Sequence, residues 1–475
     1  MTKALPLPQI SLVFHDTQLR KKVRFMPHKN NHVTMYTCGP TVYHYAHIGN
    51  FRTYVFEDLL RRTLKFFGHQ VEQVMNITDV DDKTIRGAME SNVSLQEYVQ
   101  PYKNAFFADI QSLGIERAEH YPCATAYIRQ MIDFIQKLID RNVAYKSHDG
   151  SVYFAIDKCP DYGKLSHLKL DELTISRIEN DEYEKENVGD FVLWKAYDEK
   201  RDGTIYWESP FGKGRPGWHL ECSAMAMEIL GETIDIHVGA VDNIFPHHEN
   251  EIAQSECLSC KQFVRTWLHS EHLIVNGKKM SKSLGNFYTL RDLLDKGYKG
   301  LEVRYMLLHT HYRTQLNFTF EGMDGARTSL HRLNDFVLRC QEKASHEEPL
   351  GVVEIPLKKA FKEFCEAIAD DLNISVALAA LFDLMREVNA KMEQMNGGDA
   401  SSVLAVLQQF NRILGVLSFE QETGPPPHLL QLLEKRNQAR KEKNWSESDR
   451  LRDEIAASGY VIEDTPSGAR LKVRT

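Results

Sequence analysis

One stretch near the N-terminus has the order strand, loop, helix, strand, which leaves few possible folds. Residues 33–37 have the composition of a strand, and the Cys-Gly-Pro sequence at 38–40 ends it. Apolar residues then recur on one face of a helix until Gly68, and residues 71–77 predict a second strand. Parallel strands need such a crossover connection. We therefore predict an α/β fold with a doubly wound parallel sheet, Rossmann-like, in which ligands bind at the carboxyl ends of the strands.

The pattern changes along the 475-residue chain, whose length predicts about three domains at roughly 150 residues each. An amphipathic helix, short strands and an acidic run at 179–186 indicate an insertion between two halves of the sheet, with a separate domain as the alternative. Helical patterns dominate after about Gly322, and a Gly-Pro-Pro-Pro break at 424–427 precedes a small last module. The predicted boundaries are 1–126 and 217–321 for the two halves of the Rossmann-like catalytic domain, 127–216 for the connective insertion, 322–423 for a helical bundle and 424–475 for the C-terminal module.

The composition is that of an ordinary globular protein, with 42% hydrophobic and 26% charged residues. The longest apolar stretch, residues 374–385, is too short to cross a bilayer. Residues 1–18 lack the basic head and apolar core of a signal peptide. We therefore expect a cytoplasmic protein with no membrane partner. The net charge of −8 gives no global sign of nucleic-acid binding, so any contact with phosphates has to come from local patches.

Two segments far apart in the sequence both suggest phosphate binding. Residues 279–283, Lys-Met-Ser-Lys-Ser, place two lysines in a short polar loop that can close on a polyphosphate. Such loops are also common as solvated surface turns. Far upstream, His47 and Gly49 stand where a strand gives way to a helix, and helix N-termini bind anions. Together the two segments predict one nucleotide site.

A possible metal site combines residues from three parts of the chain. The eight cysteines are scattered, so we expect reduced thiols or metal ligands rather than a disulfide framework. His247 and Glu251 are four residues apart on a helix predicted to start near Pro246, so both can face one metal ion. Cys38 and Cys222 can complete a Cys₂HisGlu site, which would favour zinc, if the sheet edge brings them together. The alternative is a solvated His/Glu pair on a helix surface.

Two nearby patterns resemble other metal motifs. His248 and Glu249 look like part of a metalloprotease signature, but Ile252 stands where its second histidine is required. Cys257 and Cys260 have the spacing of a zinc knuckle, but no second pair follows at the distance that a zinc ribbon needs. We interpret this cysteine pair as structural, with an oxidation-prone or second zinc site as the alternative.

Six motifs together resemble one known family. They are Thr-Cys-Gly-Pro-Thr-Val-Tyr at 37–43, His-Ile-Gly-Asn at 47–50, Asn-Ile-Thr-Asp-Val-Asp-Asp-Lys at 76–83, Gly-Arg-Pro-Gly-Trp-His at 214–219, Phe-Pro-His-His-Glu-Asn-Glu at 245–251 and the lysine loop at 279–283. The chain resembles the cysteinyl-tRNA synthetases, a family of class I aminoacyl-tRNA synthetases, from its first strand to its last module.

The resemblance implies how cysteine is selected. It assigns one zinc ion per chain to four ligands, Cys38, Cys222, His247 and Glu251, the same set that ligand chemistry suggests. The zinc would take the thiolate of the substrate cysteine as a further ligand, which serine cannot replace because a hydroxyl binds zinc far less well than a thiolate. Thr78, Trp218 and His237 match family positions that line the amino-acid pocket; core packing is the competing interpretation for Thr78 and Trp218.

The resemblance also implies a reaction in two steps. The cysteine carboxylate attacks the α-phosphate of ATP, and the resulting adenylate acylates the terminal adenosine of tRNA(Cys). We expect catalysis by positioning and charge stabilisation, with His47, Lys279 and Lys282 as catalytic residues and Lys282 contacting the transition state. ATP would be bound by His47, Gly49, Asn50 and Lys282. Magnesium would accompany the phosphates, although the sequence does not identify which carboxylate would bind it.

The chain departs from the family pattern at three places, one of which, Ile374-Ser375 in place of the more usual Thr-Pro, is a packing variation. Asn50 stands where many class I enzymes have histidine, and an amide can donate a hydrogen bond but carries no positive charge. We therefore expect His47 and the lysines to supply more of the electrostatic stabilisation of the phosphates. At the C-terminus, residues 469–471 lack a tryptophan that is often found there.

Two other functions fit part of the sequence. A related ligase that adenylates cysteine and transfers it to an amino sugar would lack much of the C-terminal tail, whereas this chain has a basic helix at 435–441 and a matching segment at 463–468. A zinc-stabilised nucleic-acid-binding protein without catalysis would explain the metal residues but not the lysine loop. The expected partners are therefore tRNA(Cys), L-cysteine and ATP, and the expected form is a monomer.

Overall fold

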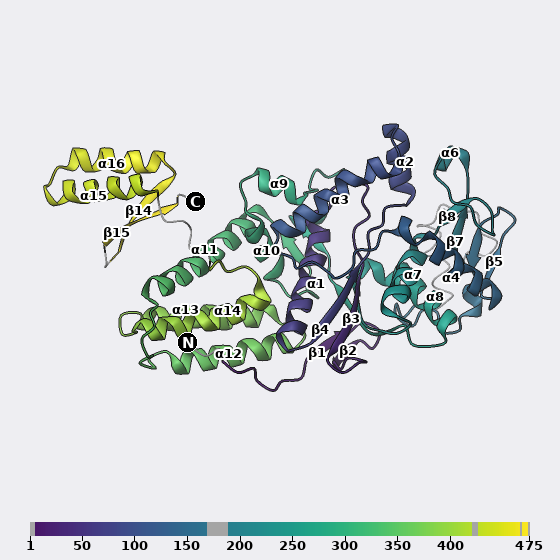
Figure 1. Cartoon of the computed structure of the whole chain (residues 1–475), viewed down its shortest axis with the longest axis horizontal. Coiled ribbons are helices and arrows are strands. Elements are labelled where there is room, and N and C mark those ends of the chain that lie inside the picture. The colour runs from purple at the N-terminus through teal and green to yellow at the C-terminus, as the bar shows by residue number, and fades with distance from the viewer. Residues whose placement is uncertain (1–4, 169–188, 420–425, 466–467, 474–475) are drawn as a thin grey trace. The chain divides into compact units, whose positions relative to one another are not determined.

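The computed structural model describes residues 5–168, 189–419, 426–465 and 468–473. The acidic run at 179–186 and residues 424 and 425 of the Gly-Pro break lie outside these ranges. Figure 1 shows the two compact units into which the chain divides, Met1–Leu417 and Ser418–Thr475. The finer boundaries expected from the sequence remain predictions.

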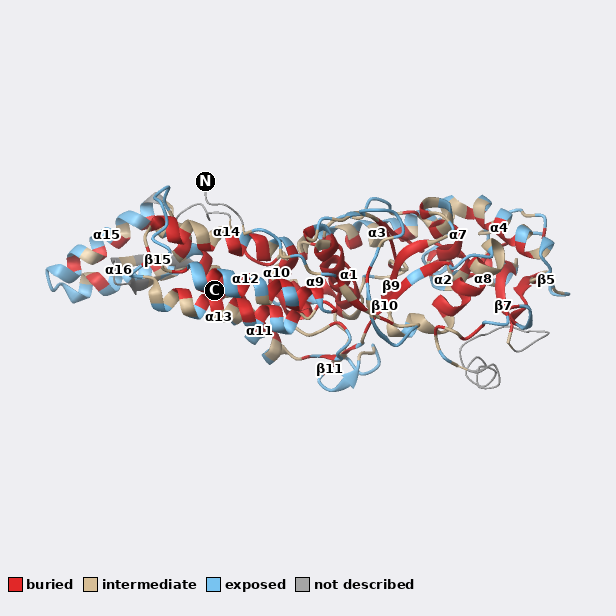
Figure 2. Ribbon diagram, turned by 90° about the horizontal axis from the view of Figure 1, so that it is seen from below, coloured by how far each residue is buried: buried red, intermediate tan, exposed pale blue. Residues whose placement is uncertain are grey.

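The core of the first unit is a parallel sheet. Four strands, β3 (His32–Thr37), β4 (Gln70–Met75), β9 (Ile234–Ala240) and β10 (Val264–Ser270), pair in the order β10-β9-β3-β4, all of them parallel. Helix α1 (Ile48–Phe66) is the crossover from β3 to β4. Figure 2 shows β9 and β10 coloured almost entirely as buried, as expected for strands covered on both faces. The predicted α/β fold with a parallel sheet is confirmed.

A long insertion separates β4 from β9. It begins with three helices, α2 (Asp82–Ser91), α3 (Leu95–Ser112) and α4 (Ile128–Asp140). An antiparallel sheet follows, with the strands β5 (Ala144–Lys146), β6 (Val152–Phe154), β7 (Phe191–Ala196) and β8 (Gly214–Pro216) in that order. The apolar face of α4 packs into a hydrophobic cluster with this sheet, which gives the insertion a core of its own. Helix α7 (Trp218–Leu230) then leads back to β9.

Short elements after β9 carry several predicted site residues. A turn of π-helix, η4 (Ile244–His248), is followed by helix α8 (Glu249–Ser259), where the sequence had predicted one helix starting near Pro246. After β10 comes a small sheet of β11 (Leu273–Val275), β12 (Lys278–Lys279) and β13 (Leu316–Phe318). Helices α9 (Leu290–Asp295) and α10 (Gly300–Leu308) lie between β12 and β13 in sequence.

The remainder is mostly helical, as predicted. The first unit ends with α11 (Phe320–Lys343), α12 (Glu354–Ala369), α13 (Ile374–Lys391) and α14 (Gly397–Leu414). The second unit contains α15 (Pro427–Lys441), α16 (Trp445–Ala457) and a hairpin of β14 (Tyr460–Thr465) and β15 (Gly468–Val473). The basic stretch at 435–441 forms the last part of α15. Within the described ranges, no helix is both long enough and apolar enough to cross a membrane.

A buried arginine joins the helical region to the sheet domain. Arg304 of α10 is fully buried, forms an ion pair with Asp58 of α1 at 2.5 Å, and donates from Nε to the carbonyl of Leu414 at 2.8 Å. Arg62 contacts the same carboxylate at 2.7 Å. These charge-assisted contacts give hydrogen-bonding partners to buried polar groups of α1, α10 and α14 at one point.

Replacing this arginine should destabilise the first unit strongly. We expect Arg304→Met to cost about 3 kcal/mol, because removing one partner of a buried ion pair leaves the other charge poorly compensated. Urea denaturation followed by tryptophan fluorescence measures the loss. The control is Lys362→Met, which removes an exposed pair with Glu366 and should change stability by less than about 0.5 kcal/mol. Equal effects of the two changes would contradict the role of Arg304.

Candidate active site and metal centre

The predicted metal ligands meet at the carboxyl edge of the parallel sheet. Cys38 directly follows β3, and its backbone N–H donates to the carbonyl of Val238 in β9 at 3.3 Å. His247 and Glu251 follow the end of β9, and Glu251 Oε1 lies 3.1 Å from His247 Nε2. The spacing of four residues thus places a nitrogen and an oxygen together, although a junction between η4 and α8 replaces the continuous helix that was predicted.

The structure also brings the second cysteine into this cluster. Cys222 is buried on α7, and the interaction of its sulfur with the Cys38 thiol is the first cause of the raised pKa of Cys38. Among the described residues, the group of potential ligand atoms close enough for one ion nevertheless contains His248 in place of Cys222. The atoms of Cys38, His247, His248 and Glu251 all lie within 4.8 Å of one another, and His248 Nε2 is 3.3 Å from Cys38 Sγ. In the sequence, His248 had drawn attention only as part of an incomplete metalloprotease motif.

Burial makes the groups of this cluster neutral in the absence of a cation. It lowers the pKa of His247 and of His237 to about 3, and it raises the pKa of Glu251 to about 8. The pKa of Cys38 is raised well above its usual value, first by the hydrogen bond with Cys222 and then by burial. Neutral imidazole is the form of histidine that binds metals.

One buried oxygen tests whether the site suits a cation. Glu251 is fully buried, and its Oε1 has no hydrogen-bond donor among the described residues, although it faces His247 Nε2 at 3.1 Å and His248 Nε2 at 3.9 Å. An orphaned carboxylate oxygen surrounded by imidazole and thiol groups fits a positive ion. Sulfur, nitrogen and oxygen donors in one group are the set that zinc accepts.

A second layer of contacts holds the cluster in place. His219 Nδ1 lies 2.9 Å from His247 Nδ1, and the Trp218 ring stacks on His247 at 4.2 Å between ring centroids. His237 Nε2 lies 2.9 Å from Glu251 Oε2. Trp218 is 44% exposed whereas His237 is fully buried, so of these two predicted pocket residues Trp218 is the one that borders solvent.

Thr78 belongs to a buried polar chain beside the cluster. Its hydroxyl accepts from Asn76 Nδ2 and donates to Glu221 Oε2, each at 3.1 Å. Glu221 precedes Cys222 on α7, and burial raises its pKa well above the usual value. Sequence spacing did not single out Asn76 or Glu221, because their link to Thr78 forms only when α7 packs against the end of β4. The three residues tie the predicted amino-acid pocket to the cysteine of α7.

The first phosphate segment forms the N-terminus of α1, as predicted. His47 is the N-cap: its Nδ1 accepts from the Asn50 backbone N–H, and its own N–H donates to Asn50 Oδ1, both at 3.1 Å. Burial lowers the pKa of His47 to about 4, so the ring is neutral at pH 7 and carries its proton on Nε2. His47 is therefore a neutral donor, and the positive charge at this end of the site comes from the lysines.

The lysine loop lies against this helix start. Lys282 Nζ is 5.3 Å from the centroid of the Phe287 ring, and the His47 ring also lies against that ring, at 5.2 Å between centroids. Gly49 allows close approach, since a Cβ there would lie 3.1 Å from the methyl carbon of Met280 in the loop. The two predicted phosphate segments thus meet, although they are more than two hundred residues apart in the chain. Lys279 is exposed on β12.

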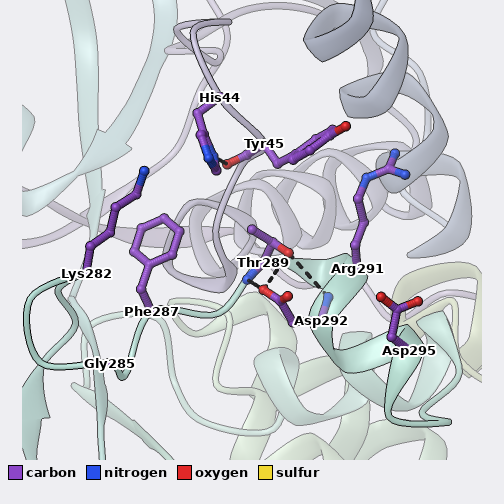
Figure 3. A pocket seen from close by; sticks show the side chains of 9 residues that line it. All are labelled: His44, Tyr45, Lys282, Gly285, Phe287, Thr289, Arg291, Asp292 and Asp295. Carbon is purple, nitrogen blue, oxygen red and sulfur yellow. Dashed lines mark hydrogen bonds between the residues drawn. The ribbon is translucent and has the colours of Figure 1, made fainter.

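A pocket of about 500 Å³ opens beside Lys282 and Phe287. Figure 3 shows Lys282, Phe287 and His44 on one side of it and Arg291 with Asp295 on the other. The polypeptide around Lys282 is held by Asn286, whose Oδ1 accepts from the Ser281 N–H at 2.8 Å and whose Nδ2 donates to the Lys279 carbonyl at 3.1 Å. The loop therefore presents Lys282 in a defined position next to open space.

Family models match nearly the whole chain. A model described as the tRNA synthetases class I (C) catalytic domain matches residues 24–328. A DALR domain matches residues 363–419, and a cysteinyl-tRNA ligase anticodon binding domain matches residues 423–474.

Individual proteins give the same result. Cysteine–tRNA ligase of Protochlamydia amoebophila is 59% identical over 472 residues, 98% of each chain. That of Chlamydia felis is 58% identical over 466 residues, covering 97% of this chain and 98% of its own. Among solved structures, Mycobacterium tuberculosis methionyl-tRNA synthetase with methionyl-adenylate superposes with a TM-score of 0.61 at 13% identity, over 80% of this chain and 90% of its own, and so shares the fold. The motifs, the site and these comparisons lead to one conclusion: the chain belongs to the cysteinyl-tRNA synthetase family of class I aminoacyl-tRNA synthetases.

Proposed function

We propose that this chain joins L-cysteine to tRNA(Cys) through a cysteinyl-adenylate. In the first step the cysteine carboxylate attacks the α-phosphate of ATP and pyrophosphate leaves; in the second, a hydroxyl of the terminal adenosine of the tRNA attacks the acyl carbon and AMP leaves. The observation that carries the proposal is the meeting of Lys282 and His47 across Phe287, at the sheet edge that also holds the Cys38 cluster. Groups that can bind phosphate and groups that can bind a soft metal ion lie at one edge, which suits the adenylation of an amino acid with a thiol side chain.

Cysteine would be selected at the buried cluster. Cys38, Cys222, His247 and Glu251 would hold a zinc ion, with His248 as a close neighbour of Cys38. When bound, zinc supplies a soft Lewis acid to which the substrate thiolate can bind. Contacts from His219 and His237 orient His247 and Glu251. Thr78, Trp218 and His237 would line the pocket for the amino acid.

The phosphates of ATP would bind between the helix start and the lysine loop. The positive end of the α1 dipole favours an anion, and His47 offers its Nε2–H without a positive charge. Gly49 and Asn50 keep this turn close to the ligand, while Lys279 and Lys282 supply the positive charge that stabilises the phosphoryl oxygens in transit. Magnesium would accompany the phosphates.

The acceptor, location and oligomeric state follow from the same proposal. The C-terminal unit, with the basic part of α15, supports tRNA as the acceptor rather than an amino sugar. Both phosphate segments and all candidate metal ligands come from one chain, which supports a monomer. All eight cysteines are free, in keeping with the reducing cytoplasm.

Two reactions of the purified protein test this function. The full chain should catalyse cysteine-dependent exchange of pyrophosphate into ATP and should charge tRNA(Cys). Deleting residues 418–475 should reduce charging far more than exchange, because that unit is separate from the sheet domain that carries the site. Absence of cysteine-dependent exchange in the full chain would refute the proposal, and an equal loss of both reactions in the deletion would refute the role of the tail.

The lysine loop generates a second test. Lys282→Ala should lower the rate of pyrophosphate exchange about 100- to 1000-fold, the usual cost of removing one transition-state donor. The matched control is Lys278→Ala, because Lys278 is also an exposed lysine, on β12, and has no proposed role in the reaction. Both variants should melt like the parent protein. Exchange at the parental rate in Lys282→Ala would remove this residue from the mechanism.

His47 gives a test with a pH signature. His47→Asn keeps an N-cap, because asparagine is a favoured capping residue, but removes the imidazole donor, so exchange should fall at every pH. The pKa of His47 is about 4 in the folded protein and about 6.5 when unfolded, so the unfolded state binds more protons between these values. The parent therefore loses stability relative to the variant as pH falls from 6.5 to 4, by at most about 1.4 kcal/mol per pH unit. Melting curves of both proteins across this range measure the difference; a constant difference would contradict the low pKa.

Two substitutions separate the candidate metal ligands. Cys222→Ser should lower both the zinc content and the affinity for cysteine if Cys222 is a ligand. His248→Gln should retain zinc, because this proposal leaves His248 outside the ligand set. Elemental analysis of the purified variants, with melting curves as a folding control, distinguishes them. Loss of zinc in His248→Gln with full occupancy in Cys222→Ser would exchange the two roles.

A further inference from the structure

Three cysteines that take no part in the proposed mechanism line one pocket. Cys159 follows a short helix of the insertion, Cys257 lies in the last turn of α8, and Cys260 is the residue that caps α8. All three line a cavity of about 490 Å³, to which none of the proposed metal, ATP or amino-acid residues contributes. Cys159 is buried, Cys257 is partly buried and Cys260 is exposed, so the cavity connects the inner thiols to solvent.

The contacts divide these thiols into a pair and a single residue. Cys159 lies in the buried hydrophobic cluster against which Cys257 packs, and its thiol interacts with the sulfur of Cys257. The Cys260 sulfur instead accepts from Arg141 Nη1 at 3.0 Å, and the same nitrogen donates to the Cys257 carbonyl at 3.3 Å. The sequence places Cys257 and Cys260 together as a Cys-x-x-Cys motif, but the fold gives Cys257 a partner from the insertion.

A second metal site does not account for this cluster. Among the described residues, the group of cysteine, histidine and acidic side chains with ligand atoms close enough for one ion is that of Cys38. Cys159, Cys257 and Cys260 do not form such a group with each other or with Glu256. Cys159 and Cys257 instead line one cavity and pack in one cluster with their thiols interacting, which is the arrangement that precedes a disulfide.

The surroundings distinguish the chemical roles of the two thiols. The hydrogen bond from Cys159 lowers the pKa of Cys257, with help from the positive charges of Lys164 and Arg141 and against the burial of the sulfur and the negative charge of Glu256. The same hydrogen bond raises the pKa of Cys159. Cys257 is thus the better nucleophile, because the thiolate is the reactive form.

We propose that Cys159 and Cys257 are a site of reversible oxidation by hydroperoxides. The Cys257 thiolate attacks the peroxide oxygen that bears hydrogen, the O–O bond breaks, and sulfenic acid forms while hydroxide leaves from hydrogen peroxide or alkoxide from an organic hydroperoxide; the leaving anion takes up a proton to give water or an alcohol. The Cys159 thiol then attacks the sulfenic sulfur, water leaves, and the S–S bond forms. Two thiols and one peroxide are consumed, and a cellular dithiol returns the pair to the reduced state by exchange.

The position of the pair gives the disulfide a structural consequence. It would link the insertion covalently to the C-terminal end of α8, whose first turn carries Glu251. Six residues along an α-helix correspond to about 9 Å, so the bond would lie on the helix that also supports the metal cluster. In a reducing compartment, disulfides of this kind are transient responses rather than structural bonds.

Peptide mapping of the full-length protein tests the site. The purified protein, with its metal content recorded, is treated with hydrogen peroxide, alkylated and digested for mass spectrometry. The expected product is a crosslinked pair of peptides joining Cys159 to Cys257, which dithiothreitol abolishes. Cys159→Ser should stop the reaction at Cys257 sulfenic acid, trapped by dimedone, while Cys260→Ser, the matched control, should keep the crosslink.

Three results would overturn the proposal. They are a crosslink between Cys257 and Cys260, a crosslink confined to Cys38 and Cys222, and oxidation of Cys260 with Cys159 and Cys257 left reduced. Melting curves show whether each variant is folded. If Cys159→Ser does not fold, Cys159→Ala serves in its place, since a small apolar residue suits the hydrophobic cluster around this position.

Discussion

The pairing of β3 with β9 is the contact on which the site depends. These strands lie about two hundred residues apart in sequence, yet Tyr36 is directly opposite His237 and Thr37 is opposite Val238. Because the strands are parallel, their carboxyl ends meet at one edge, and Cys38 comes next to the segment that carries His247 and Glu251. A slip of one residue would turn Cys38 to the other face of the sheet and dismantle the cluster.

Burial sets the chemistry of this edge. Desolvation lowers the pKa of His237, His247 and His269 to about 3 and raises that of Glu251 to about 8. A bound cation would stabilise the charged form of this cluster, since a fully buried carboxylate needs a compensating positive charge. The phosphate side differs, because the Lys282 side chain is exposed while His47 is held as a cap. One part of the edge is therefore buried and the other opens to solvent.

Much of the fold and of the site could be predicted from local patterns. The crossover unit from β3 to β4 could be predicted from a strand-like segment, a helical pattern that ends at Gly68 and a second strand-like segment. His47 stands at the start of the helix and caps it with its own side chain. Predictions from spacing were less exact. The helix expected at Pro246 is interrupted by a π-helical turn, and the partners of Thr78 and Cys257 come from distant elements that spacing cannot identify.

The sequence by itself determined the fold class, the family and the residue types of both binding clusters, because these depend on short motifs and on periodicity within single elements. Tertiary structure decided which groups touch. It placed His248 beside Cys38, made His47 a neutral donor, and paired Cys257 with Cys159 rather than Cys260. Those outcomes depend on burial and on contacts between segments far apart in the chain, and neither is a property of any one segment.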